Sequence, residues 1–442
     1  MRTLLDQIKS ELALPGDRMP VLIYIIAGSV ILVPVALLAK GFVDVVLSTA
    51  AATCLLRSIV QRDASWMREP WITAAIVLWV YITIRGFLSI DPAESGVKAL
   101  GWIRFIVFGA ALQFVLTKSP GARQALLYSI IAMTVFGAAD ALFQYVVGHD
   151  IFGRPKIDKR LTGPLPNPSI AMLLLIVGLP ATIFLIKDVI AGAQQRQVRF
   201  WSLLSLVMIF ATIALAGERM ALLMSFVILA IVLLLLLRSP VKVAIVTAIY
   251  VGGTAVLFLL SPQIQQRQLS SFTEIASGTS SIYSRAMMAG LHVIEENPIF
   301  GVGIKNFKAH CAQSATEAEV GNACILIHPH QVWLHITAET GLIGAAGFLT
   351  VFVLALMPAV RLWRSWMQEP LLAGATIAVL VRLLPFTPSG NFFSNWRESF
   401  FWFLLGTSAA MVRIMMQERQ AAESTQVSGN QRPGSAPTAQ SS

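Results

Sequence analysis

Charged side chains are scarce in this sequence of 442 residues. Asp, Glu, Lys and Arg make up 13% of the chain, whereas 56% of its residues are hydrophobic. A soluble domain of ordinary composition carries about twice that share of charged residues, so the composition excludes an ordinary soluble domain. The net charge of +10 would suggest a nucleic-acid partner in a soluble protein, but in a membrane protein it mostly reports the loops. We expect an all-α polytopic membrane protein that binds no nucleic acid.

We expect no cleavable leader, and we find no convincing internal repeat. Residues 1–20 mix basic and acidic side chains, and no small-residue cleavage site follows the first apolar run. This segment predicts an uncleaved cytoplasmic N-terminus rather than a signal peptide. No convincing repeat relates the two halves of the chain, which argues against a secondary transporter.

Long apolar runs, in contrast, are abundant. Each approaches the roughly 20 residues that cross ~30 Å of hydrocarbon. We predict twelve spans, at residues 21–39, 42–60, 71–90, 97–117, 124–147, 169–187, 201–216, 220–237, 241–260, 333–358, 371–388 and 398–416. The Lys and Arg of the short loops favour an orientation with both termini cytoplasmic. Spans one to nine occupy 21–260, a large periplasmic loop containing short helices occupies 261–331, spans ten to twelve occupy 332–416, and a disordered cytoplasmic tail occupies 417–442.

Charges inside the early spans are expected to serve the protein interior. Arg85 and Arg104 are costly in lipid and should face other helices, and Asp44 should lie at a helix interface. Otherwise the first four spans offer little chemistry and are interpreted as scaffold.

A basic cluster on the outer side violates the charge bias. Arg154, Lys156, Lys159 and Arg160 follow the fifth span. Such a cluster predicts an anionic partner, either a lipid diphosphate or acidic head groups of membrane lipids; a solvated loop is the alternative. Arg219, in the short turn after the seventh span, has a planar fork suited to phosphate oxygens, although it could instead snorkel to the interface or pair with its neighbour.

The long outer loop has secondary structure and cysteines of its own. Ser280 or Ser281 can cap a helix to about Glu296, which places Arg285 and His292 on one face. Gly301 and Gly303 suit a tight turn with close backbone approach. Cys311 and Cys324 share this loop, and an oxidising compartment favours a disulfide between them.

Two histidines flank Pro329 just before the tenth span. We expect Pro329 in the first helical turn, so that the positive end of the helix dipole keeps His330 neutral, as a general base requires. His335 and Glu339, four residues apart, should pair, with Glu339 orienting or structural. Two alternatives stay open: the histidines and the loop cysteines bind zinc, or the histidines only serve the helix start.

This stretch resembles the O-antigen ligase and polymerase family of bacterial inner membranes. The matching residues are Asn297, Pro298, Gly301 and Gly303 of N-P-x-x-G-x-G, His328 and His330 of H-x-H, Glu339 and Gly341 of E-x-G, with AGERMALL at 216–223 and Arg285 as further fits. Gln331 and Glu218 depart from the pattern. The resemblance implies a multi-pass inner-membrane enzyme that moves a glycan from undecaprenyl diphosphate to a sugar hydroxyl of lipid A-core, with its active site facing the periplasm.

The resemblance also implies roles for individual residues. His330 is the expected catalytic base, Arg219, Arg285 and the 154–160 cluster hold the diphosphate, and His328, Glu339, Gly301 and Gly303 support the site. Because the outer side offers no paired aspartates, arginines would take the place of a metal, and we expect an inverting transfer without a cofactor. A polymerase of the same family and a lipid-linked-sugar flippase are the alternatives.

Overall fold

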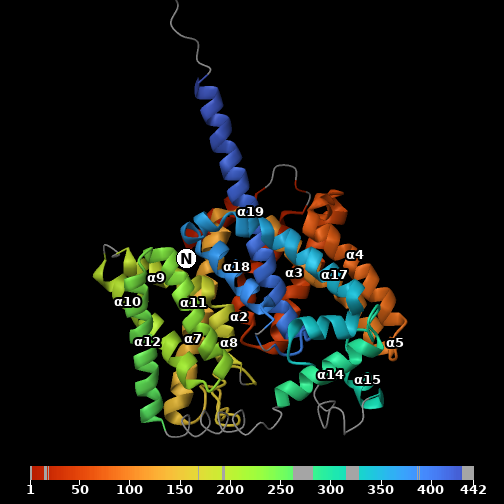
Figure 1. The fold of residues 1–442 in the computed structure, drawn as a ribbon. Helices are drawn as coiled ribbons and strands as arrows, with labels where there is room; N and C mark the ends of the chain where they lie inside the picture. The colour runs from red at the N-terminus through yellow and green to blue at the C-terminus, as the bar shows by residue number, and fades with distance from the viewer. Residues whose placement is uncertain are drawn as a thin grey trace, which may run out of the picture.

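The computed structural model describes residues 2–13, 17, 19–167, 169–191, 195–261, 282–314, 328–385, 387 and 389–430. Helices dominate these residues (Figure 1). In chain order they are α1 (Arg2–Leu12), α2 (Pro20–Ala36), α3 (Lys40–Gln61), the 3-10 helix η1 (Ser65–Arg68), α4 (Pro70–Phe87), α5 (Pro92–Gly101), α6 (Ile103–Lys118), α7 (Pro120–Val147), α8 (Ile170–Ile176), α9 (Leu179–Ile190), α10 (Arg196–Leu215), α11 (Arg219–Leu237), α12 (Pro240–Leu260), α14 (Ile282–Glu296), α15 (Phe307–Ser314), α17 (Val332–Arg361), the 3-10 helix η3 (Trp363–Gln368), α18 (Pro370–Leu383) and α19 (Asn395–Asn430).

The membrane-protein expectation is confirmed. Among the described residues, nine helices are long and apolar enough to cross a membrane, and the bent pair α8 and α9 makes ten if it is one span. Two shorter apolar helices, α2 and α18, fill the remaining predicted segments. The elements therefore cover all twelve predicted spans, while the number of crossings stays a prediction.

Helix starts follow simple rules of local sequence. Proline occupies the first turn of many spans, where its missing N–H would have no intrahelical partner anyway. Side chains cap other starts: Ser119 accepts from the Ala122 N–H at 3.0 Å, and Asp91 accepts from the Glu94 N–H at 3.0 Å. These caps satisfy backbone donors that would otherwise be left open at the helix ends.

Two helices form the centre of the bundle. α19 packs along α6, and these two spans bury the largest share of their residues, whereas α12 at the edge buries the least. Trp102 and Trp402 meet edge to face between them, with ring centroids 4.9 Å apart. Outward apolar side chains such as Leu260, 74% exposed, are consistent with a lipid-facing surface.

One end of the bundle collects the segments of interest. α14 and α15 lie there together with the start of α17, and α19 projects from the opposite end (Figure 1). We call the end of the bundle that holds α14 and α15 the α14 end. The starts of α8 and α11 and the end of α18 belong to the same end, because the contacts described below join them.

Three expectations about elements are wrong in detail. The sixth span is not one straight helix: α8 and α9 are bent by 62°. α17 begins at Val332, after Pro329, so Pro329 lies before the first helical turn. α19 continues over residues 417–430, where we expected a disordered tail, because this stretch is rich in Glu, Gln, Arg and Ala, which are good helix formers. Residues 431–442 lie outside the described part of the chain.

Candidate active site at the α14 end

The helix that carries His335 and Glu339 is broken. Gly341 has φ 66° and ψ −176°, far from helical values, so α17 consists of two helical pieces joined at this residue. Such a backbone conformation is essentially restricted to glycine. A break leaves carbonyls on one side and N–H groups on the other without their helical partners.

Residues 297–306, the motif loop, supply those partners. Four backbone hydrogen bonds join it to the break: Val302 N–H to Ala338 O at 3.0 Å, Gly303 N–H to Glu339 O at 2.8 Å, Leu342 N–H to Pro298 O at 2.8 Å, and Ile343 N–H to Ile299 O at 3.3 Å. The motif loop thus substitutes for helical hydrogen bonds on both sides of Gly341. The N-P-x-x-G-x-G and E-x-G patterns are two halves of one structural unit.

Glycine is required where the two backbones touch. A Cβ on Gly341 would lie 2.1 Å from Ile299 O, and one on Gly301 would lie 2.4 Å from Gly341 N. Gly301 and Gly303 also have positive φ, at 66° and 93°. The prediction of a tight turn with close backbone approach at these glycines is confirmed.

Two side chains of α4 hold the motif loop from the other side. The Tyr81 hydroxyl donates to Thr340 O at 2.8 Å, beside the break. Arg85 donates through its guanidinium to Gly301 O at 2.8 Å and to Phe300 O at 3.3 Å. Arg85 therefore faces the protein, as predicted, and α4 is part of the support of the site rather than inert scaffold.

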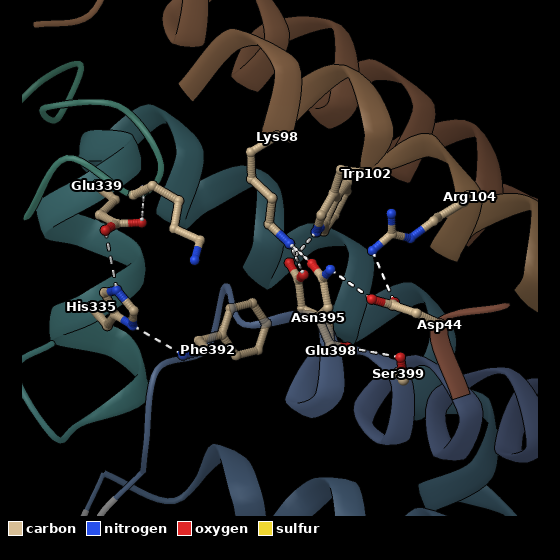
Figure 2. Close-up of polar contacts among 11 residues, drawn as sticks. Asp44, Lys98, Trp102, Arg104, His335, Glu339, Phe392, Asn395, Glu398 and Ser399 are labelled. Atoms are coloured by element: carbon tan, nitrogen blue, oxygen red, sulfur yellow. Dashed lines mark hydrogen bonds and ion pairs between the residues drawn. The ribbon is translucent and has the colours of Figure 1, made fainter. Parts of the chain in front are cut away.

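Glu339 is buried beneath the motif loop. Its carboxylate accepts from the Lys305 N–H at 2.8 Å and the Phe307 N–H at 3.4 Å. His335 Nε2 lies 3.3 Å from Glu339 Oε1, so the predicted pair is present (Figure 2). On its other side the imidazole accepts the Phe392 N–H at Nδ1, at 3.1 Å. Because Nδ1 accepts, the neutral ring carries its proton on Nε2, facing Glu339.

The loop between α18 and α19, residues 384–394, clamps the histidine segment. Its Phe392 N–H binds His335, and its Ser389 N–H donates to His330 O at 2.7 Å. His330 itself has φ 58°, a left-handed conformation that few non-glycine residues adopt. On the opposite side Pro329 packs on α14, where a Cβ on Gly290 would lie 2.7 Å from Pro329 Cβ. The segment is therefore fixed between α14 and the last loop.

The three histidines lie close together. The rings of His328 and His330 have centroids 4.2 Å apart, and those of His328 and His335 are 6.1 Å apart. Burial lowers the pKa of His328 to about 2, and the positive charge of Arg397 acts in the same direction. The pKa of His330 is also lowered, first by burial and then by the positive charge of Arg397. His330 is therefore held neutral, but by burial and a guanidinium rather than by the first turn of a helix.

Two arginines, Arg382 and Arg397, lie at the borders of the last loop. Arg397, in the first turn of α19, acts electrostatically on both His328 and His330. Arg382, near the end of α18, is 6% exposed and stacks over Phe400 with 5.8 Å between the guanidinium carbon and the ring centroid. The two arginines come from opposite ends of a loop and lie near enough to act electrostatically on each other.

The arginines predicted to hold a diphosphate are spread over the α14 end. Arg219 opens α11 and is exposed, after a short turn through Gly217 as predicted. Arg285 is half-buried on α14, and its Nε is buried without a hydrogen-bond partner among the described residues. α14 ends at Glu296, which confirms the predicted stop before Asn297.

The basic cluster after α7 has a divided role. Arg154 donates to Pro164 O at 2.9 Å and Lys156 donates to Tyr145 O at 3.1 Å, so these two cations stabilise the fold of their own loop. Lys159 is exposed with φ 60°. Arg160 lies near Glu218 and stabilises its charged form. Of the cluster, Arg160 is the member that approaches the start of α11.

The cysteine and zinc expectations have different outcomes. Cys311 is buried on α15 and is disulfide-bonded, whereas Cys324 lies outside the described residues, so their pairing stays a prediction. Within the described ranges no group of three His, Cys, Asp or Glu side chains is arranged to hold a metal ion. A bonded Cys311 also has no thiolate to offer as a ligand.

Sequence reasoning missed the buried polar network that fixes the start of α19. Lys98 binds Asn395 and lies 2.7 Å from Glu398, whose side chain is fully buried, and Trp102 donates to the same carboxylate at 2.6 Å (Figure 2). Asp44 links Asn395 to Arg104, at 2.7 and 3.1 Å, which confirms the helix-interface role of Asp44. A Lys and a Glu inside apolar segments were the available signal, because such charges must find partners.

We expect Lys98→Met to destabilise the protein by about 3–5 kcal/mol, because it leaves the Glu398 charge buried without its cation. Thermal unfolding of the purified protein measures the change. Lys118→Met, at the exposed end of α6, is the matched control and should change stability little. Lys98→Met combined with Glu398→Gln should recover much of the loss; equal effects of Lys98→Met and Lys118→Met would show that the ion pair contributes nothing.

Comparison with known families gives one match. Residues 204–349 match the family model described as O-antigen ligase. This segment runs from α10 into α17 and contains Arg219, the motif loop, the three histidines and Glu339, but neither Arg382 nor Arg397. No curated protein matches the chain.

Proposed function

We propose that this chain, whose residues 204–349 match the O-antigen ligase family model, transfers a glycan from undecaprenyl diphosphate to a sugar hydroxyl of lipid A-core. The observation that carries this proposal is His330. It is a neutral imidazole, clamped by the last loop, close to Arg397 and at one end of a membrane bundle. A general base and fixed cations are what sugar transfer from a lipid diphosphate needs.

In the proposed reaction His330 takes the proton of the acceptor hydroxyl. The acceptor oxygen forms a bond to the anomeric carbon while the bond from that carbon to the diphosphate oxygen breaks, on the opposite face, so the anomeric centre inverts. The electron pair of the broken bond leaves with the diphosphate. Arg219, Arg285 and Arg160 are the predicted cations that neutralise it, with Arg154, Lys156 and Lys159 nearby in sequence. His328, Glu339, Gly301 and Gly303 keep the histidine segment and the motif loop in place.

Localisation completes the proposal. The family and the orientation favoured by the basic residues support an inner-membrane protein with both termini in the cytoplasm. The α14 end then faces the periplasm, where a lipid-linked glycan and lipid A-core meet.

The proposal is tested by reconstituting purified protein in lipid with glycan-diphosphate-undecaprenol and lipid A-core. We expect glycan on the core without ATP, and the same rate within about twofold in EDTA, because guanidinium groups take the part that a divalent ion plays elsewhere. Strict loss of transfer in EDTA would contradict this mechanism. Extension of the lipid-linked chain instead of core modification would identify a polymerase, and donor movement across vesicles without transfer would identify a flippase.

A further inference from the structure

Arg397 lies where distant parts of the chain converge. It interacts electrostatically with groups from four other elements: Lys40 at the start of α3, Glu218 before α11, His328 and His330 before α17, and Arg382 on α18. No sequence motif identified above contains it, and it lies beyond the matched family segment. Its guanidinium lies against Gly390, which follows Ser389, and the Ser389 N–H binds His330 O, so Arg397 lies close to the proposed base.

The direction of Arg397 is fixed by its neighbours in the chain. Asn395 binds Asp44 and Lys98, and Glu398 binds Lys98 and Trp102 (Figure 2). Trp396 Nε1 donates to Leu37 O at 2.8 Å. These bonds tie Asn395, Trp396 and Glu398 to residues of α3 and α5, to the C-terminal end of α2 and to the junction of α5 and α6. The first turn of α19 therefore cannot rotate easily. A preorganised cation loses little free energy when it binds an anion.

Gly390 provides a platform for the guanidinium. A Cβ built on Gly390 would lie 0.7 Å from one terminal nitrogen of Arg397 and 1.5 Å from its central carbon. The guanidinium therefore occupies the space that any larger residue at 390 would fill. Gly390 adjoins Ser389, which clamps His330 through its N–H, so one short segment positions both the base and this cation.

Charge around Arg397 is unbalanced. Lys40 and Arg382 add positive charge, and Glu218 is the carboxylate whose field reaches Arg397. Within the described part of the chain, Arg397 forms no direct ion pair with a carboxylate. Glu218 already accepts the Ala171 N–H at 2.9 Å, and burial raises its pKa to about 7. Glu218 thus serves the start of α8, and among the described residues it forms no ion pair with Arg397.

We propose that Arg397, held against Gly390 close to His330, binds the diphosphate of the lipid-linked donor. This inference rests on the proposed function and deepens it by naming a donor-binding residue outside the family segment. The planar fork presents two parallel N–H groups to phosphate oxygens, next to His330 and against Gly390.

The test measures binding of undecaprenyl diphosphate, the product lipid, to the full-length protein in nanodiscs. Arg397→Gln should weaken binding by about tenfold to hundredfold, the range for losing hydrogen bonds to a charged group. The affinity of Arg397→Lys should lie between those of the wild type and Arg397→Gln, since lysine keeps the charge and loses the planar fork of the guanidinium. Gly390→Ala keeps the arginine and should weaken binding as well, because its Cβ displaces the guanidinium. Arg413→Gln, on the far part of α19 beside Glu69, is the control and should bind as wild type.

The outcomes separate two failures. Wild-type binding that Arg397→Gln and Gly390→Ala leave unchanged would overturn this inference alone. No binding by the wild type, together with no glycan transfer, would overturn the proposed function with it. A variant that only loses thermal stability while its affinity per folded molecule is unchanged also speaks against a role for Arg397 in diphosphate binding. In the same preparations the Arg397→Gln donor KM should rise, whereas the acceptor KM should not.

Discussion

His330→Gln lowers the turnover number for glycan transfer by about 10²–10⁴-fold, the usual contribution of a general base. Glutamine keeps a side chain of similar length with a hydrogen-bonding end but cannot take the acceptor proton at neutral pH. The backbone clamp through His330 O and Ser389 N–H does not involve the ring, so the variant should keep its fold. Turnover by the purified protein, with donor and acceptor saturating, measures the effect.

The control for this substitution is another histidine at the same end. His149→Gln changes an exposed imidazole whose Nδ1 contacts Asp150 O at 2.9 Å, outside the proposed machinery. Its turnover should stay within about twofold of wild type, as expected for a surface site. If His330→Gln and His149→Gln have the same turnover, His330 is not the base, and His328 becomes the next candidate.

The pH dependence gives a second measurement of the same role. Burial and the charge of Arg397 both hold the pKa of His330 below its ordinary value of 6.5. A base with a lowered pKa stays unprotonated as the pH falls through 6.5, so turnover should persist below that pH and decline only as the lowered pKa is reached. Arg397→Gln removes the charge that helps to lower the pKa of His330. In the pH profile of turnover for this variant, the decline at acid pH should therefore begin closer to 6.5. An acid limb at or above 6.5 in wild type would contradict a neutral His330 held by its surroundings.

Local sequence signals predicted much of the fold because each acts over a short range. Apolar runs located every span-like element, and Asn297-Pro298 located the end of α14. The break at Gly341 was not predictable this way, since glycine is common inside membrane helices and usually serves packing. Its conformation depends on a motif loop about forty residues earlier in the chain, whose N–H and C=O groups replace the helical ones.

The candidate site shows the same division. The histidines, Glu339 and the glycines were found because they lie in one stretch with recognisable spacing. The pairing of His335 with Glu339 followed from their separation of four residues on a helix. Lys40, Lys98, Tyr81 and Glu398 were not found, because their partners are distant in sequence and only the packing of α4, α5 and α19 brings them together. Arg397 lies in none of the sequence motifs, and its contact with Gly390 could be found only from the coordinates.

Gly341→Ala should be strongly destabilising, with a loss of about 3 kcal/mol or more in the free energy of unfolding. An L-residue at φ 66° and ψ −176° is strained by about 1–3 kcal/mol. The added Cβ would also lie 2.1 Å from Ile299 O, so the motif loop must separate from α17. That separation removes the hydrogen bonds from Leu342 and Ile343 to the loop and loosens the cover over Glu339.

Thermal unfolding of the purified variant tests the loss of stability, and limited trypsin digestion tests its location. If the motif loop is displaced, cleavage after Lys305 and Lys308 should become faster, while sites at the opposite end of the bundle should not change. Gly252→Ala is the matched control: Gly252 is helical in α12 with nothing within 4 Å of the added Cβ, so stability should change by no more than about 0.5 kcal/mol. A Gly341→Ala protein as stable and as resistant to trypsin as this control would mean that α17 tolerates a continuous helix. The motif loop would then have no part in holding the histidine segment, and the link between the N-P-x-x-G-x-G and E-x-G patterns would be lost.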